Sequence, residues 1–149
     1  MIREITEQGI FKNIFHLSNR IQVEGDKLSN ELTLKQWCLL LVLYKNSTKE
    51  PSINDIALSM GVTRQSAKKM VSTLEKGGYL SVNKSSSDNR ALCVSPTQKS
   101  YDFFKQNKSL GYELLGEIFD GINDDELAVT FQVLCKMQNN LKERIENEQ

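Results

Sequence analysis

The chain has 149 residues, of which 39% are hydrophobic and 26% charged, and its formal net charge is zero. This is the length of one ordinary domain with enough apolar content for a core. The zero sum hides an asymmetry: residues 51–100 carry seven Lys and Arg against three Asp and Glu, whereas residues 101–149 carry five against ten. A local basic surface in the middle third permits nucleic-acid binding without requiring it.

Several functional classes are excluded by what the sequence lacks. No apolar run approaches the ~20 residues of a membrane span, and the opening MIREITEQG lacks the cationic-then-apolar order of a signal peptide, so we expect a cytoplasmic protein with no membrane partner. Three cysteines without a CxxC pair argue against a disulfide framework and a thiolate metal site. With one histidine and no Gly-rich phosphate loop, we expect no enzyme, no cofactor and no metal.

The first predicted element is a helix over about residues 3–30. Its apolar residues follow a seven-residue rhythm: Ile10, Ile14, Leu17, Ile21 and Leu28. A matching rhythm occurs near the end of the chain: Leu127, Phe131, Leu134, Leu141 and Ile145. Because a narrow apolar stripe packs along another helix, the terminal helices are predicted to pack on each other or on the same helices of a second chain.

The starts of the other helices are marked by capping patterns, in which a short polar residue precedes by three positions a side chain able to reach back. These patterns open at Thr33, Ser52, Ser95 and Asn123, and they predict helices from about 34, 53, 96 and 124. Pro96 suits the first position of the third helix, because the N–H it lacks has no partner there. Thr63 is predicted to cap a further helix over about 63–77.

The helix over 63–77 has two unlike faces. Its apolar residues recur at helical spacing and are predicted to pack on Ile56, Ala57 and the Leu39–Leu43 face of a preceding helix: Ala67, Met70, Val71 and Leu74. The opposite face carries polar and basic groups, with Lys68 on its flank: Gln65, Lys69, Ser72 and Lys76. Such groups suit phosphates and base edges, although most helices have a polar side.

Between Gly78 and Ser95 the apolar period changes to two, which predicts two short strands. Leu80 and Val82 on the first strand, and Leu92 and Val94 on the second, are predicted to face inward, with Cys93 on the outer side. The segment between the strands, KSSSDNR at 84–90, has no apolar residue and is predicted to be a mobile tip in solvent. Two helices joined by a tight turn and followed by a hairpin form a winged helix-turn-helix, whose second helix enters the major groove.

Three segments, LTLKQWCLLLVL, INDIALSMGVTRQSAKKMVSTLEKGGYL and SSDNRALCVSPT, resemble the MarR (multiple-antibiotic-resistance regulator) family of bacterial transcription factors, and the resemblance covers nearly the whole chain. It implies one domain over 1–149 with a mainly α fold and a small two- or three-stranded antiparallel wing. A winged helix-turn-helix at 33–95, with its recognition helix at about 63–77 and its wing at about 79–94, is flanked by dimerisation helices at 3–30 and 97–147.

The resemblance also implies a function. Members of the family bind a near-palindromic operator in double-stranded DNA as homodimers, most often as ligand-responsive repressors, although an activator would use the same fold. Arg90 is implied to enter the minor groove, with Asp88 orienting it, which agrees with the negative potential of a narrow A·T-rich groove. The candidate phosphate contacts are Arg64, Lys68, Lys69 and Lys84. Gln65, which shares its face with Ser72, is a candidate for pairing with adenine or for contacting phosphate or water.

Members of this family often hold an aromatic or phenolic effector between the dimerisation helices and the winged region. His16, Trp37 and Tyr44 lie on the segments that are expected to border that crevice, so they are the candidate effector contacts. Each of them is equally compatible with ordinary packing.

Two alternative functions remain. A winged-helix protein–protein adaptor would need apolar residues on the outer face of helix 63–77, where this chain has Gln, Lys and Ser. An oxidant-sensing regulator would use Cys93, but no neighbouring cation is evident that would activate its thiol.

Overall fold

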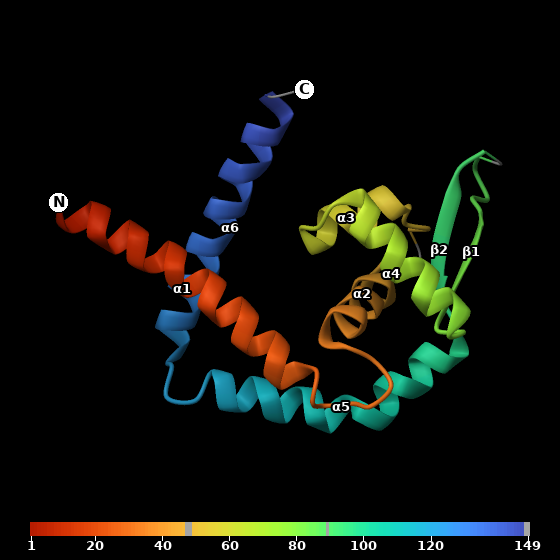
Figure 1. The fold of residues 1–149 in the computed structure, drawn as a ribbon, viewed down its shortest axis with the longest axis horizontal. Helices are drawn as coiled ribbons and strands as arrows, with labels where there is room; N and C mark the ends of the chain where they lie inside the picture. The colour runs from red at the N-terminus through yellow and green to blue at the C-terminus, as the bar shows by residue number, and fades with distance from the viewer. Residues whose placement is uncertain (47–48, 89, 148–149) are drawn as a thin grey trace. The chain divides into compact units, whose positions relative to one another are not determined.

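The computed structural model describes residues 1–46, 49–88 and 90–147, and only the backbone of residues 145–147. These residues form six helices and two strands (Figure 1): α1 (Ile2–Gly25), α2 (Leu34–Lys45), α3 (Ile53–Met60), α4 (Arg64–Lys76), β1 (Leu80–Lys84), β2 (Leu92–Pro96), α5 (Gln98–Ile118) and α6 (Asp124–Asn147). The mainly α fold with an antiparallel wing is confirmed, and the wing has two strands within the described residues. The chain divides into two compact units, residues 1–111 and 112–149.

Side-chain caps begin the helices where the sequence predicts them. Before α2, the Gln36 N–H donates to Thr33 Oγ1 at 3.3 Å, and the Thr33 N–H donates to Gln36 Oε1 at 3.0 Å. The same reciprocal pair forms before α3 and α6, from Ser52 with Asp55 and from Asn123 with Glu126. Each pair satisfies two N–H groups at the chain's entry into a helix, which explains why these starts can be predicted from short patterns.

The start predicted at residue 96 is wrong. Ser95 and Pro96 lie in β2, where they are paired with Ser81 and Leu80, and α5 begins only at Gln98. The pairing of β2 with β1 extends through these residues, and Pro96, which has no N–H to donate, stands at the last position of the strand. The pairing of β2 with β1 therefore outweighs the local capping pattern at Ser95.

The core of the first unit lies between α2, α3, α4 and the hairpin. Leu39, Leu43 and Ile56 are fully buried, and Ala67 and Leu74 of α4 pack against them in the same cluster. The predicted packing of the apolar face of α4 is thus confirmed, and its polar face is left outside. Gly61 ends α3 with φ 65°, a left-handed conformation that glycine adopts without a Cβ clash.

The predicted alternation of inward and outward residues fails on β2. Cys93 and Val94 are both buried, whereas Leu92, predicted to face inward, is 52% exposed. The Val94 N–H donates to the Pro51 carbonyl oxygen at 2.9 Å, and β2 also packs on α2 and α3, so successive residues of the strand are covered. Cys93 was expected on the outer side of the wing; its burial removes the accessible thiol that the oxidant-sensing alternative requires.

Hydrogen bonds join the C-terminal end of α4 to the beginning of α5. Lys99 Nζ donates to the Gly77 carbonyl oxygen at 2.8 Å, and Thr97 Oγ1 donates to the Gly78 carbonyl oxygen at 2.6 Å. Gly78 has φ 77°, which allows the chain to turn sharply out of the helix. We call these four residues the α4 clamp.

Tyr79 anchors the segment that follows α4. Its hydroxyl donates to Glu31 Oε2 at 2.7 Å, and its ring lies edge-to-face on Phe103 of α5 with 6.1 Å between centroids. Burial and the neighbouring carboxylate together raise the pKa of Tyr79 to about 12. Tyr79 therefore ties the loop between α1 and α2 to the entry of the wing.

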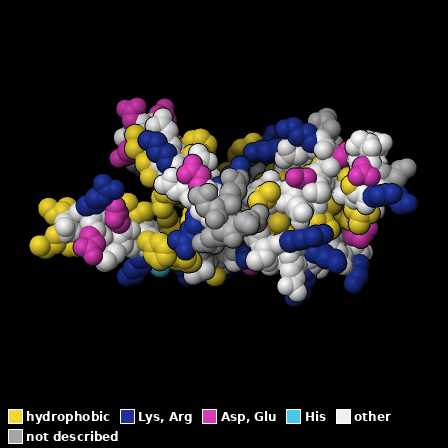
Figure 2. Space-filling view, turned by 90° about the horizontal axis from the view of Figure 1, so that it is seen from above, with side chains coloured by type: hydrophobic (Ala, Val, Ile, Leu, Met, Phe, Trp, Pro, Cys, Tyr) yellow, Lys and Arg dark blue, Asp and Glu magenta, His cyan; other side chains and the backbone are white. Residues whose placement is uncertain are grey.

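Apolar side chains are exposed on α1 and, separately, on α6. On α1, Ile10 is 43% and Leu17 53% exposed, and hydrophobic side chains are visible at the left of Figure 2, where this helix lies. On α6, Phe131 is 70% and Leu141 61% exposed, while the side chain of Ile145 lies outside the described residues. In the part of the chain that the structure describes, no helix combines the length and apolarity needed to cross a membrane.

Candidate nucleic-acid interface

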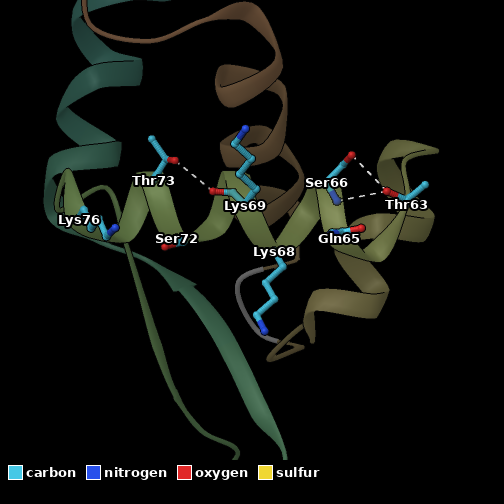
Figure 3. A pocket seen from close by; sticks show the side chains of 8 residues that line it. All are labelled: Thr63, Gln65, Ser66, Lys68, Lys69, Ser72, Thr73 and Lys76. Atoms are coloured by element: carbon cyan, nitrogen blue, oxygen red, sulfur yellow. Dashed lines mark hydrogen bonds between the residues drawn. The ribbon is translucent and has the colours of Figure 1, made fainter.

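The polar face of α4 is exposed along its whole length. Gln65, Ser72 and Lys76 lie in a row along the middle of this face, and Lys68 and Lys69 project to its two sides (Figure 3). A shallow, open groove follows the face. It is lined by Thr63, Gln65, Ser66, Lys68, Lys69, Ser72, Thr73 and Lys76.

The hydroxyl groups of Thr63 and Thr73 form hydrogen bonds within the helix and its cap. The Ser66 N–H donates to Thr63 Oγ1 at 3.1 Å, which confirms Thr63 as the cap, and Thr73 Oγ1 donates to the Lys69 carbonyl oxygen at 3.0 Å. Their hydrogen bonds leave the long side chains of Gln65 and the three lysines as the groups that extend furthest into solvent.

The groove is strongly basic. Three of the residues that line it are lysines and none is acidic. Within the described residues, no hydrogen bond or ion pair occupies the side-chain nitrogens of Lys68, Lys69 or Lys76. Unpaired ammonium groups along one face of a helix attract a polyanion and release its counterions on contact.

Lys76 lines the groove but is not among the DNA contacts predicted from the sequence, although the helical spacing places it on this face. The signal was its spacing: Gln65, Ser72 and Lys76 stand at i, i+7 and i+11, which is one stripe of a helix. Arg64, by contrast, is exposed but does not line the groove.

The wing carries the remaining DNA candidates. β1 and β2 pair antiparallel with Lys84 opposite Leu92, and the Ser85 N–H closes the tip by donating to the Ala91 carbonyl oxygen at 2.8 Å. Asp88 Oδ1 accepts a hydrogen bond from the backbone N–H of Arg90 at 2.9 Å. Asp88 therefore shapes the turn at Arg90 through the main chain, and the Arg90 side chain is exposed.

The tip of the wing is also held from outside the hairpin. Glu50, in the segment between α2 and α3, accepts hydrogen bonds from Ser86 Oγ at 2.9 Å, the Ser86 N–H at 3.2 Å and Ser85 Oγ at 3.1 Å. These bonds, chiefly those from Ser86, hold the pKa of the Glu50 carboxyl below its ordinary value. No pattern in the sequence indicates this contact, because its partners are 35 or more residues apart.

The three effector candidates occupy different environments. Trp37 is 6% exposed and packs edge-to-face on Phe103, with 5.1 Å between ring centroids. Tyr44 is 50% exposed and lies against Tyr101 of α5 at 5.4 Å. His16 is exposed on α1, and among the described residues no hydrogen bond or ring contact joins it to either aromatic residue.

Residues 31–91 match the sequence model of the MarR family, and this range covers α2, α3, α4 and β1 and ends just before β2. Over these residues, the resemblance drawn from the sequence is confirmed. Among the described residues, no three or more His, Cys, Asp or Glu side chains lie together in a group that could hold a metal ion.

Solved structures share the fold over most of the chain. A MarR/EmrR family transcriptional regulator from Acinetobacter sp. ADP1 is 18% identical over 92% of this chain and 97% of its own, with a TM-score of 0.81. S. aureus MepR in complex with DNA is 21% identical over 93% and 98%, with a TM-score of 0.76. CouR from Rhodococcus jostii RHA1, bound to p-coumaroyl-CoA, is 17% identical over 87% and 91%, with a TM-score of 0.78.

Proposed function

We propose that this chain, which has the fold of MarR-family transcriptional regulators and matches that family over residues 31–91, is a cytoplasmic, sequence-specific DNA-binding regulator and not an enzyme. It acts as a homodimeric, ligand-responsive repressor on a near-palindromic operator. The observation that carries the proposal is the exposed face of α4, where three lysines and Gln65 project from a helix whose opposite face is locked into the core.

α4 enters the major groove, which is wide enough for a helix. Lys68 and Lys69, on the two sides of the face, contact phosphates, and Gln65 in the middle contacts a base edge. Ser72 and Lys76 continue the same row, and Arg64 adds a further charge. The polar character of this face, without an apolar patch, favours DNA over a protein partner as the occupant.

The wing supplies the minor-groove contact. Arg90 enters a narrow groove beside the site of α4, with Asp88 fixing the turn from which it extends and Lys84 reaching a phosphate. An Arg in this position distinguishes operators by the width of the groove, because a narrow A·T-rich groove has the most negative potential.

The homodimer is supported by the exposed apolar residues of α1 and α6. Side chains as large as Phe131 and Leu141, more than half exposed in the single chain, follow the seven-residue rhythm of helices that pack along other helices. A two-fold dimer presents two copies of α4 to successive half-sites, and this matches a near-palindromic operator.

The effector of this regulator is a small aromatic or phenolic compound. The half-exposed ring of Tyr44, which lies against Tyr101 and Phe104, offers an aromatic surface of the right character, and Trp37 and His16 are further contacts. Release from the operator needs a coupling free energy of only about 1–3 kcal/mol. Unchanged thermal stability and DNA affinity in millimolar aromatic acids would rule the effector out.

The decisive experiment measures binding of the purified protein to the DNA that flanks its own gene, followed by footprinting. We expect saturable binding to one near-palindrome, at least about a thousandfold tighter than to shuffled DNA of the same composition. Arg90→Ala should weaken this binding while Lys136→Ala, a change on the exposed surface of α6, should leave it unaltered. Weak binding that depends neither on the DNA sequence nor on Arg90 would contradict the proposal. A protein would then be the partner to search for.

A further inference from the structure

Glu50 is the point at which the segment before α3 meets the tip of the wing. Its carboxylate takes three hydrogen bonds, two from Ser86 and one from Ser85, and all three donors belong to the seven-residue segment between β1 and β2. Glu50 itself has φ 46°, the one positive φ outside glycine in the described residues. A conformation of this kind persists only where the surroundings hold it, so the contact fixes Glu50 as well as the tip.

The contact continues through the tip to Arg90. The Ser87 N–H donates to Ser85 Oγ at 3.3 Å, the Ser85 N–H donates to the Ala91 carbonyl oxygen, and the Arg90 N–H donates to Asp88. Ser87 and Ala91, on the two sides of Asp88 and Arg90, are therefore both hydrogen-bonded to Ser85, whose hydroxyl donates to Glu50. A tip fixed before binding loses less conformational entropy at the interface than a free one.

The charge of Glu50 acts in the opposite direction. A carboxylate within hydrogen-bonding distance of a DNA-contacting tip repels phosphates, so its removal should strengthen binding if charge were its only influence. Any role in holding the tip predicts weaker binding when the carboxylate is removed. The two effects have opposite signs, which makes the role of Glu50 measurable.

We propose that Glu50 is a positioning residue for minor-groove recognition: it holds the wing tip through Ser85 and Ser86 and thereby places Arg90. This inference rests on the proposed DNA-binding function and adds to it a residue that does not itself touch DNA. It also assigns a role to the serine-rich tip, whose hydroxyl groups serve as donors to Glu50.

The test is a double-mutant cycle on binding to the operator fragment, with Glu50→Ala, Arg90→Ala and the double variant. We expect Glu50→Ala to weaken binding by about fivefold and Arg90→Ala by about tenfold, with the double variant no weaker than Arg90→Ala, because neighbours acting through one contact are not additive. Ser86→Ala should weaken binding in the same direction as Glu50→Ala. Glu50→Gln, which keeps an acceptor oxygen without the charge, should bind DNA more tightly than Glu50→Ala, because it can still accept a hydrogen bond from Ser86.

Two outcomes would overturn the inference. The first is tighter or unchanged DNA binding by Glu50→Ala. The second is a double variant whose fold-loss of affinity equals the product of the fold-losses of the two single variants. Glu113→Ala, which removes another exposed carboxylate, controls for net charge and should bind as wild type does. Amide exchange in the free protein gives an independent readout, because Ser86 N–H protection should fall in Glu50→Ala and persist in Arg90→Ala. If wild type binds no DNA, the proposed function fails and the positioning role falls with it, while Ser86 protection still reports the contact.

Discussion

Lys69→Ala should reduce both the affinity for DNA and its dependence on salt. The lysine is exposed on α4, lines the basic groove and has no hydrogen bond or ion pair from its ammonium group in the described residues, so its removal should change stability by less than about 0.5 kcal/mol. If Lys68, Lys69 and Lys76 each neutralise one phosphate, they contribute about −2.7 per protomer to the slope of log K against log salt, and about −5 per homodimer.

The size of the effect follows from that slope. A slope of about −5 costs a thousandfold in affinity between 50 and 200 mM salt, and removing Lys69 from both protomers should reduce this loss by about tenfold. Fluorescence anisotropy with a labelled operator at five salt concentrations measures both slopes. Lys12→Ala, an exposed lysine of α1, is the matched control and should keep the wild-type slope. Equal slopes for Lys69→Ala and wild type would refute the assignment of the groove to phosphates.

Three further results are expected. Tyr79→Phe removes the hydrogen bond to Glu31 and should cost about 1–2 kcal/mol in urea unfolding at pH 7. Because the pKa of Tyr79 rises from 10 to about 12 on folding, its contribution is complete below pH 10 and is lost between pH 10 and 12, so the two proteins should converge in stability across that range. Ser52→Ala removes the cap of α3 and should lower the free energy of unfolding by about 1 kcal/mol, measured by thermal melting. Phe131→Glu should shift the protein to monomer in analytical ultracentrifugation and weaken operator binding, whereas Lys136→Glu should remain dimeric.

The sequence predicts best where the cause of a structure is local. A capping pair needs only two side chains three residues apart, so the starts of α2, α3 and α6 could be placed from Thr33, Ser52 and Asn123. The face of α4 was equally predictable, because its buried and exposed residues separate at helical spacing. The major-groove half of the candidate site follows from that spacing alone.

Prediction failed where distant segments decide the outcome. β2 runs through Pro96 because it pairs with β1, and Cys93 and Val94 are both buried because α2, α3 and Pro51 approach the strand. The contact of Glu50 with the wing has the same origin. None of these partners lies within ten residues of the position concerned, and no periodicity in the sequence points to them.

The α4 clamp and the exposed face of α4 use different residues. The helix is attached through Gly77 and Gly78 to the start of α5, after its last turn, whereas Gln65, Lys69 and Ser72 make no contribution to that attachment. Substitutions on the outer face can therefore alter which DNA sequence is preferred, while the hydrogen bonds of the α4 clamp stay the same. Under the proposed function, we therefore expect operator preference to diverge by surface changes alone, without a compensating change in the scaffold.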